Sequence, residues 1–170
     1  MDKPIRIEDN YERNKRMNWY KISQIEENTK SVEEAARDAG YNSPKLYHAT
    51  RHDKFNKFDR LVSKNGFFFS DSPRNSEFGK NTASVYLSYN NPFIADSNGG
   101  VLDGRMYQAI ENRGFDAIIS NSSSVNGIIN EYVVFKPEQI KSADPITYDD
   151  NGNEIPLNER FDKNNLDIRY

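Results

Sequence analysis

The sequence predicts an α+β domain. Several short segments have the composition of β-strands, few have the period of a helix, and the two kinds do not alternate regularly along the chain. A regular alternation of strand and helix would instead indicate a doubly wound parallel sheet. With 170 residues and no internal repeat, the chain is expected to form one domain with an extension.

The first part of the chain predicts an arm followed by a short helix. Residues 1–30 are polar and charged, with few apolar side chains, so we expect an arm that is at best weakly helical. This arm would pack on the domain or on other sequence. Ser31-Val32-Glu33-Glu34 has the pattern of a capping box, and Gly40 is a residue type at which helices end. A helix is therefore predicted over 31–39.

The middle of the chain predicts strands separated by loops. Leu46 and Tyr47 open a strand that ends near Thr50, and Phe67–Phe69 form a buried strand bounded by Gly66 and a polar turn. Apolar and polar residues alternate over 85–89, which predicts a third strand that is closed by Asn90-Asn91-Pro92. One or two helical turns are expected between these strands, over 74–80.

The second half predicts a helix, two strands and a hairpin. Apolar residues at spacings of four and three predict a helix over 103–113. Strands are expected over 115–119 and 128–135, with a polar loop over 120–127 between them. Asn151-Gly152 predicts the tight turn of a hairpin, and the last fifteen residues are expected to lie on the surface. The expected organisation is an arm over 1–30, a domain over 31–145, and a hairpin with a tail over 146–170.

The composition argues against several classes of function. The chain has no cysteine, which removes disulfides, cysteine nucleophiles and thiolate metal sites. Its net charge is -3 and no stretch is strongly basic, so nucleic acid is not an expected partner. No long apolar run indicates a signal peptide or a membrane span, and we expect a cytoplasmic protein. His48 and His52 lie in a polar stretch without helical period, which does not favour a metal site.

Three segments contain residues that together suit a binding cleft. His48 ends one predicted strand, Glu131 begins another, and Gly66–Asp71 contains three consecutive phenylalanines. Each has a plain structural interpretation, as a packed histidine or as core aromatics, but a carboxylate at the edge of an apolar strand is costly to bury unpaired. A histidine, an aromatic wall and a carboxylate could hold a flat ring that bears an amide and stabilise positive charge beside it.

The same segments resemble the ADP-ribosyltransferase superfamily, in particular its poly(ADP-ribose) polymerase and diphtheria-toxin branch with a His-Tyr-Glu signature. The strings that carry the resemblance are Tyr47-His48-Ala49-Thr50, Gly66-Phe67-Phe68-Phe69-Ser70-Asp71 and Asn130-Glu131-Tyr132-Val133-Val134-Phe135. From about residue 31 onward, the chain is also similar to ADP-ribosyltransferase-like domains of phage and mobile-element polyvalent proteins. This resemblance implies two small packed β-sheets around an NAD cleft, with short flanking helices.

The resemblance also implies roles for individual residues. His48 would hold a ribose hydroxyl of NAD, Phe68 and Phe78 would sandwich the nicotinamide, and Glu131 would stabilise the oxocarbenium-like ribose. The residues implied to bind NAD, which is the substrate, are His48, Ala49, Thr50, Phe68, Ser70, Ser76 and Phe78. The chain departs from the signature at Phe68, where the family has Tyr, and at Ala49, where it has Gly and where any positive φ would be strained.

The function implied is a mono-ADP-ribosyltransferase that modifies a protein acceptor of the host cell, acts as a monomer, and is phage-encoded or packaged in virions. A glycohydrolase that uses water as acceptor is the first alternative, and a catalytically degenerate NAD-binding or virion-associated module is the second. RNA 2'-phosphotransferases share the fold but would need a basic face, which the net charge of -3 argues against. The polar stretch Ser122–Asn126 is expected either to contact the target or to be a flexible turn.

Overall fold

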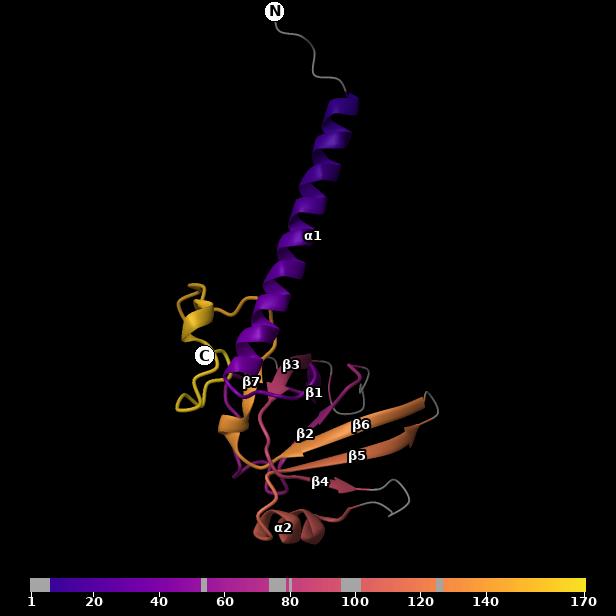
Figure 1. The fold of residues 1–170 in the computed structure, drawn as a ribbon, viewed down its shortest axis with the longest axis vertical. Helices are drawn as coiled ribbons and strands as arrows, with labels where there is room; N and C mark the ends of the chain where they lie inside the picture. The colour runs from indigo at the N-terminus through magenta and orange to yellow at the C-terminus, as the bar shows by residue number, and fades with distance from the viewer. Residues whose placement is uncertain (1–6, 53–54, 74–78, 80, 96–101, 125–126) are drawn as a thin grey trace, which may run out of the picture.

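The computed structural model describes residues 7–52, 55–73, 79, 81–95, 102–124 and 127–170 (Figure 1). One long helix precedes a mixed sheet, a short helix lies against one end of this sheet, and irregular C-terminal segments lie beside the base of the long helix. The α+β class is thus confirmed. Within the described residues, no helix is sufficiently long and apolar to cross a membrane.

Helix α1 (Ile7–Asp38) covers most of the predicted arm and the predicted helix at 31–39. The capping-box interpretation is therefore wrong. Ser31 lies inside the helix, where its hydroxyl donates to the backbone carbonyl of Glu27 at 3.1 Å. It therefore does not cap the N-terminus of a helix. The helix does end where the sequence predicted, because Gly40 follows it with a φ of +87° and allows the chain to turn away.

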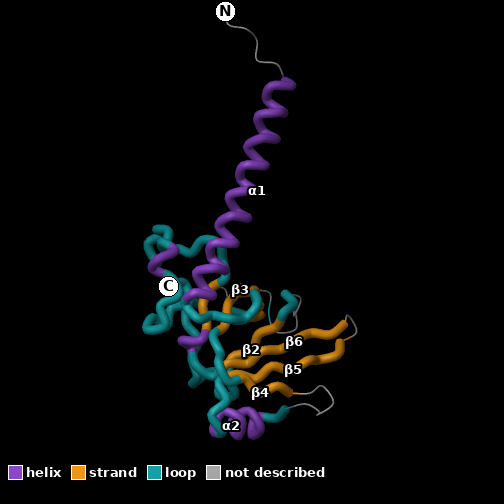
Figure 2. Tube along the Cα trace, in the orientation of Figure 1, coloured by secondary structure: helices purple, strands orange, loops and turns teal. Residues whose placement is uncertain are grey.

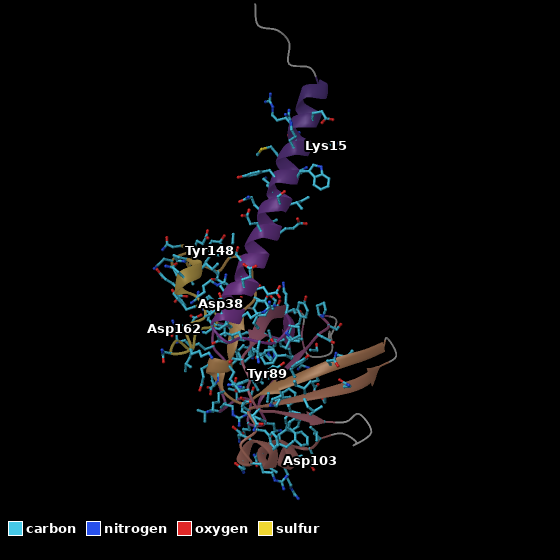
Figure 3. The ribbon with its side chains drawn as sticks, viewed as in Figure 1. Lys15, Asp38, Tyr89, Asp103, Tyr148 and Asp162 are labelled. Atoms are coloured by element: carbon cyan, nitrogen blue, oxygen red, sulfur yellow. The ribbon has the colours of Figure 1, made fainter. Side chains whose placement is uncertain are left out.

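Only the C-terminal end of α1 packs on the sheet domain. Val32 and Ala36 are buried there against Tyr41, whereas Trp19 is 63% exposed on the part that extends away from the domain. Figure 2 shows this extension as a helix without neighbouring elements, and Figure 3 shows Lys15 far from the domain. The described part of the predicted arm is thus helical, and its side chains over 12–27 do not pack on the domain.

Seven strands form one sheet in the order β4-β5-β6-β2-β1-β3-β7. Neighbouring strands are antiparallel except β4 and β5, which are parallel. The strands are β1 (Leu46–Thr50), β2 (Phe67–Ser70), β3 (Asn81–Leu87), β4 (Pro92–Ala95), β5 (Ala117–Ser124), β6 (Gly127–Val134) and β7 (Ile140–Ser142). The strand predicted over 85–89 therefore begins and ends earlier, and β4 and β7 had not been predicted.

The prediction of a polar loop over 120–127 is wrong. Residues 120–124 continue β5 and pair with β6 as far as Ser124 opposite Gly127, while residues 125–126 lie outside the described residues. The prediction failed because it required apolar side chains, whereas an antiparallel ladder is held by main-chain hydrogen bonds that polar residues can also make. The helical turns predicted over 74–80 fall mostly outside the described residues.

The two small sheets implied by the sequence are two halves of this one sheet. One half contains β4, β5, β6 and β2, and the other contains β1, β3 and β7. The halves meet at a single register pair between β1 and β2, Tyr47 opposite Ser70, whereas β2 and β6 share four such pairs. This narrow join leaves space between the halves beyond Tyr47.

Helix α2 (Gly104–Asn112) confirms the helix predicted over 103–113. Asp103 caps its N-terminus by accepting hydrogen bonds from two backbone amides of the first turn, at 2.9 and 3.0 Å (Figure 3). Ile110 is buried against Ile118 and Val133 and so fixes α2 on the sheet. On the opposite face, the main core contains Leu46, Phe58, Phe67, Phe69, Val85, Leu87, Ala117, Val134, Ile140 and Ile168.

The C-terminal segment contains the predicted hairpin but is not only a surface tail. Tyr148 and Glu154 form an antiparallel bridge around a turn in which Gly152 has a φ of +82°, as the sequence predicted. Short 3-10 helices cover Pro137–Gln139 and Leu157–Glu159. Ile168 belongs to the main core, and its amide donates to the carbonyl of Asn56 at 2.8 Å, so the tail completes the core.

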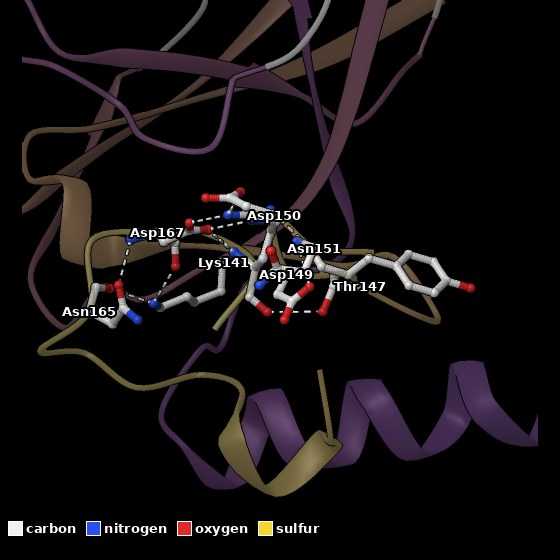
Figure 4. A network of polar contacts seen from close by, with 9 residues as sticks. Lys141, Thr147, Asp149, Asp150, Asn151, Asn165 and Asp167 are labelled. Atoms are coloured by element: carbon white, nitrogen blue, oxygen red, sulfur yellow. Dashed lines mark hydrogen bonds and ion pairs between the residues drawn. The ribbon is translucent and has the colours of Figure 1, made fainter. Parts of the chain in front are cut away.

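A buried lysine attaches this tail to the sheet (Figure 4). Lys141 of β7 is 1% exposed, and its Nζ donates to the carbonyls of Asn165 at 2.6 Å and Asp167 at 3.0 Å. Burial lowers the pKa of Lys141 to about 8, which remains high enough to keep the ammonium charged at neutral pH. Its charge-assisted hydrogen bonds thus offset part of the cost of burying the charge.

Replacing Lys141 by Met is expected to lower the free energy of unfolding at pH 7 by about 1–2 kcal/mol, because a buried and a partly buried carbonyl lose their donor. A folded-state pKa near 8 lies below the ordinary value of 10.5, so the unfolded state binds more protons between these pH values. The contribution of Lys141 to stability therefore rises from pH 8 to 10.5. Urea titrations of both proteins across this range test the prediction, which a constant difference between them would contradict.

Candidate functional site

A cavity of about 450 Å³ lies at the narrow join between the two halves of the sheet. Its walls come from β1, β2, β6 and α2, and most of the lining is apolar. The described residues that line it are Tyr47, His48, Ala49, Phe68, Phe69, Ser70, Tyr107 and Glu131. The three segments singled out in the sequence therefore meet at one place.

His48 lies where β1 and β2 separate. The register pair of Tyr47 with Ser70 is not followed by pairing at the next residues, and the ring Nδ1 of His48 instead lies 2.8 Å from the carbonyl oxygen of Phe68. The imidazole thus satisfies a carbonyl that would otherwise bond to the neighbouring strand. This contact keeps β1 and β2 apart beyond Tyr47 and fixes the histidine in the lining of the cavity.

The environment of His48 determines its protonation state. Because a carbonyl can only accept, Nδ1 must carry a proton, and in the neutral ring Nε2 then has a lone pair with which it can accept a hydrogen bond. Burial lowers the pKa of His48, which favours this neutral form at physiological pH. The rings of Phe55, Phe58 and Phe69 surround the imidazole at centroid distances of 5.7, 5.1 and 5.5 Å and restrict its orientation. The site therefore contains an oriented acceptor for a hydroxyl.

Glu131 lines the cavity from β6. It is the register partner of Ser70, which is in turn the partner of Tyr47, so the three side chains form a row across adjacent strands. Burial raises the pKa of Glu131. Among the described residues, none forms a hydrogen bond or ion pair with its carboxylate. A carboxyl in an apolar cavity without a compensating partner is the pattern of a functional group.

A pair of polar side chains fixes the strand beside Glu131. Asp71 accepts hydrogen bonds from the side-chain amide of Asn130 at 2.7 Å and from its backbone amide at 3.2 Å. The amide of Asp71 donates in return to the carbonyl of Asn130 at 3.2 Å. These contacts join the ends of β2 and β6 next to the carboxylate, so the position of Glu131 relative to Ser70 does not depend on the ladder alone.

Most of the predicted site residues are brought together. His48, Ala49, Phe68, Ser70 and Glu131 line the same cavity. Ala49 is not strained, because Phe161 is the only non-glycine residue with a positive φ in the described part of the chain. Phe68 is 36% exposed, so its ring is open to a ligand.

The remaining predicted residues do not line the cavity or are not described. Thr50 is buried, lines a separate cavity and accepts a hydrogen bond from the amide of His52 at 3.1 Å, which stabilises the turn after β1. Ser76 and Phe78 lie outside the described residues. Of the stretch Ser122–Asn126, residues 122–124 are in β5, so they are not a flexible turn. No set of three or more His, Asp or Glu within the described ranges could hold a metal ion.

Sequence reasoning missed Tyr47 and Tyr107 as residues of the cavity, and Phe69 lines it in addition to Phe68. The ring of Tyr107 meets that of Phe68 at 5.3 Å with an interplanar angle of 73°, and so closes one side. The available signal was its position three residues before the buried Ile110, on the same face of α2. This spacing could have placed Tyr107 against the sheet but not beside Glu131.

The arrangement can orient a sugar and stabilise positive charge on it. The exposed Phe68 ring offers a surface for a flat heterocycle, and Nε2 of His48 can accept from a ribose hydroxyl. Glu131 can place negative charge beside the anomeric carbon. The family model described as ADP-ribosyltransferase in polyvalent proteins matches residues 38–149. No curated protein and no solved structure matches the chain.

Proposed function

We propose that this chain, which belongs to the family of ADP-ribosyltransferases in polyvalent proteins, transfers ADP-ribose from NAD to a side chain of a protein acceptor and releases nicotinamide. In this reaction the bond between the anomeric carbon and nicotinamide breaks, and a bond to the acceptor forms. The acceptor gives up a proton. The acceptor that we propose is a host protein modified in the cytoplasm, a setting that would suit phage-encoded or virion-packaged polyvalent proteins.

The observation that carries this proposal is the placement of Glu131 and His48 in one apolar cavity. Departure of nicotinamide leaves an oxocarbenium-like ribose, whose positive charge a nearby carboxylate stabilises more strongly in a poorly solvated site than in water. An oriented imidazole that accepts from a ribose hydroxyl would keep the sugar in line with this carboxylate. The apolar walls would exclude water from the reacting atoms.

The acceptor distinguishes the transferase from an NAD glycohydrolase, in which water attacks the same carbon. The cavity supports both reactions, because the acceptor approaches from outside the residues that hold NAD. We favour transfer because family membership supports ADP-ribosyltransferase activity, and we favour an active site because Ala49 is unstrained and Phe68 keeps an accessible ring. A degenerate binding module would retain NAD binding without turnover.

Purified protein incubated with NAD labelled in its adenylate part tests this proposal. Transfer predicts that nicotinamide is released and that the label becomes attached to proteins of a bacterial lysate, with release faster when lysate is present. Hydrolysis predicts equal release without lysate and free labelled ADP-ribose. Release of no nicotinamide by protein that still binds NAD would overturn both enzymatic proposals and leave the binding module.

A further inference from the structure

Tyr107 lines the cavity from a helix, α2, whereas the other described lining residues belong to strands. Helix α2 holds it firmly, because Ile110 is buried in the core beneath the sheet and Glu111 forms an ion pair with Arg60 at 2.7 Å. The capping of α2 by Asp103 fixes the turn that precedes Tyr107. The ring is therefore attached to a rigid support and not to a loop.

The hydroxyl of Tyr107 shares a poorly solvated space with the carboxyl of Glu131. Both side chains line the same cavity. Burial raises the pKa of Tyr107, and the charge of Glu131 raises it further. In the part of the chain that the structure describes, neither the hydroxyl nor the carboxylate has a hydrogen-bond partner. A donor and an unpaired acceptor therefore face the same cavity.

We propose that Tyr107 is the positioning residue of Glu131: its hydroxyl donates a hydrogen bond to the carboxylate and holds it towards the bound ribose. This hydrogen bond is not formed in the free protein; it would form when bound NAD displaces water from the cavity, since hydrogen bonds are stronger in a dry site. This role rests on the proposed function. Tyr107 acts through Glu131 and does not itself take part in breaking or forming bonds.

A hydrogen bond to the ionised form of a carboxyl favours that form. Tyr107 thus counteracts the effect of burial, which raises the pKa of Glu131 and favours the neutral acid. The other titratable groups that face the cavity are Tyr47 and His48 of β1. His48 donates to the carbonyl of Phe68, and Tyr47 lies two strands away from Glu131, so Tyr107 is the donor best placed to keep it ionised.

Replacing Tyr107 by Phe tests this proposal because it removes the hydroxyl and keeps the ring against Phe68. We expect kcat for nicotinamide release to fall roughly tenfold, the loss of one charge-assisted hydrogen bond, with KM for NAD changed less than about threefold. The acidic limb of the pH profile of kcat should move to higher pH. Tyr148→Phe, at a tyrosine that is 51% exposed in the C-terminal hairpin, is the matched control.

A second measurement does not depend on activity. The carboxyl of Glu131 is titrated by ¹³C NMR in protein with labelled glutamate, assigned with Glu131→Gln, both free and with a non-hydrolysable NAD analogue. In the complex its pKa should be higher in Tyr107→Phe than in wild type, whereas in the free proteins, where the hydrogen bond is not formed, the two values should differ less. If wild type lacks turnover, the proposed function fails, but the titration of the complex with the NAD analogue still decides the role of Tyr107.

Three results would overturn the role of Tyr107. The first is an unchanged pKa of Glu131 in the complex of Tyr107→Phe with the NAD analogue. The second is a rise in KM for NAD with an unchanged kcat, which would indicate that Tyr107 only contacts the substrate. The third is an upward shift of the Glu131 pKa in Tyr47→Phe that matches or exceeds the shift in Tyr107→Phe, which would assign the donor to β1.

Discussion

Replacing Glu131 by Gln is expected to lower kcat for nicotinamide release by about 10²–10³-fold while changing the affinity for NAD by less than about threefold. Gln has the shape of Glu and still fits beside Ser70 and Tyr107 in the cavity. It cannot supply the negative charge that stabilises the ribose as nicotinamide leaves. Because that charge matters most in the transition state, its loss affects kcat and not substrate binding.

The same substitution is expected to stabilise the fold at pH 7. Burial raises the pKa of Glu131 in the folded protein above its ordinary value of 4.5. At lower pH the carboxyl is protonated in both the folded and the unfolded state, and its burial costs little free energy. As pH rises through the folded-state pKa, the carboxylate ionises inside an apolar cavity, and stability is lost. Glu131→Gln should therefore raise the free energy of unfolding at pH 7 by about 0.5–2 kcal/mol, and this gain should disappear near pH 4.

Urea unfolding at pH 4 and pH 7, together with nicotinamide release and titration of NAD binding, checks both expectations. Glu154→Gln is the matched control, because Glu154 is exposed in the C-terminal hairpin and should affect neither quantity. A variant that binds NAD poorly but retains kcat would make Glu131 a binding residue. A variant that is less stable than wild type at pH 7 would show that an undetected partner stabilises the ionised carboxylate.

The site residues that lie in short segments with a characteristic strand pattern could be predicted from the sequence. His48, Phe68 and Glu131 each stand at a characteristic place in a strand, and strands separated in the chain meet because β2 pairs with both β1 and β6. Tyr107 could not be placed in this way. Its spacing from Ile110 predicts a helix face, but which side chain of that face reaches Glu131 depends on how α2 lies on the sheet.

The errors in predicting the fold from the sequence have a common physical cause. Residues 12–27 of α1 are exposed and the end of β5 is polar in sequence, so the hydrophobic period gave little information about them. The helix continues because its main-chain hydrogen bonds are local and no Pro or Gly interrupts it between Ile7 and Asp38. The β5–β6 ladder continues because its main-chain hydrogen bonds join the two strands whether or not their side chains are apolar. Patterns of burial predict the core, whereas these elements extend beyond it.

Replacing Gly66 by Ala is expected to lower the free energy of unfolding by about 2–4 kcal/mol. Gly66 precedes β2 with a φ of +111°, which L residues rarely adopt. A Cβ atom there would lie 2.6 Å from Cγ1 of Val133 and 3.0 Å from the carbonyl oxygen of Val134. Both neighbours belong to β6, so relief of the clash requires β2 and β6 to move apart.

That movement would also affect the site, because Ser70 faces Glu131 in the same ladder. Gly66→Ala should therefore lose activity even at temperatures at which it remains folded. Gly114→Ala isolates the steric part, since Gly114 has a φ of +89° but, apart from its own chain neighbours, nothing lies within 4 Å of an added Cβ. This control should cost only the backbone strain, about 1 kcal/mol, and retain activity. Equal losses of stability in the two variants would mean that backbone conformation alone requires glycine, and that the contact with β6 does not restrain β2.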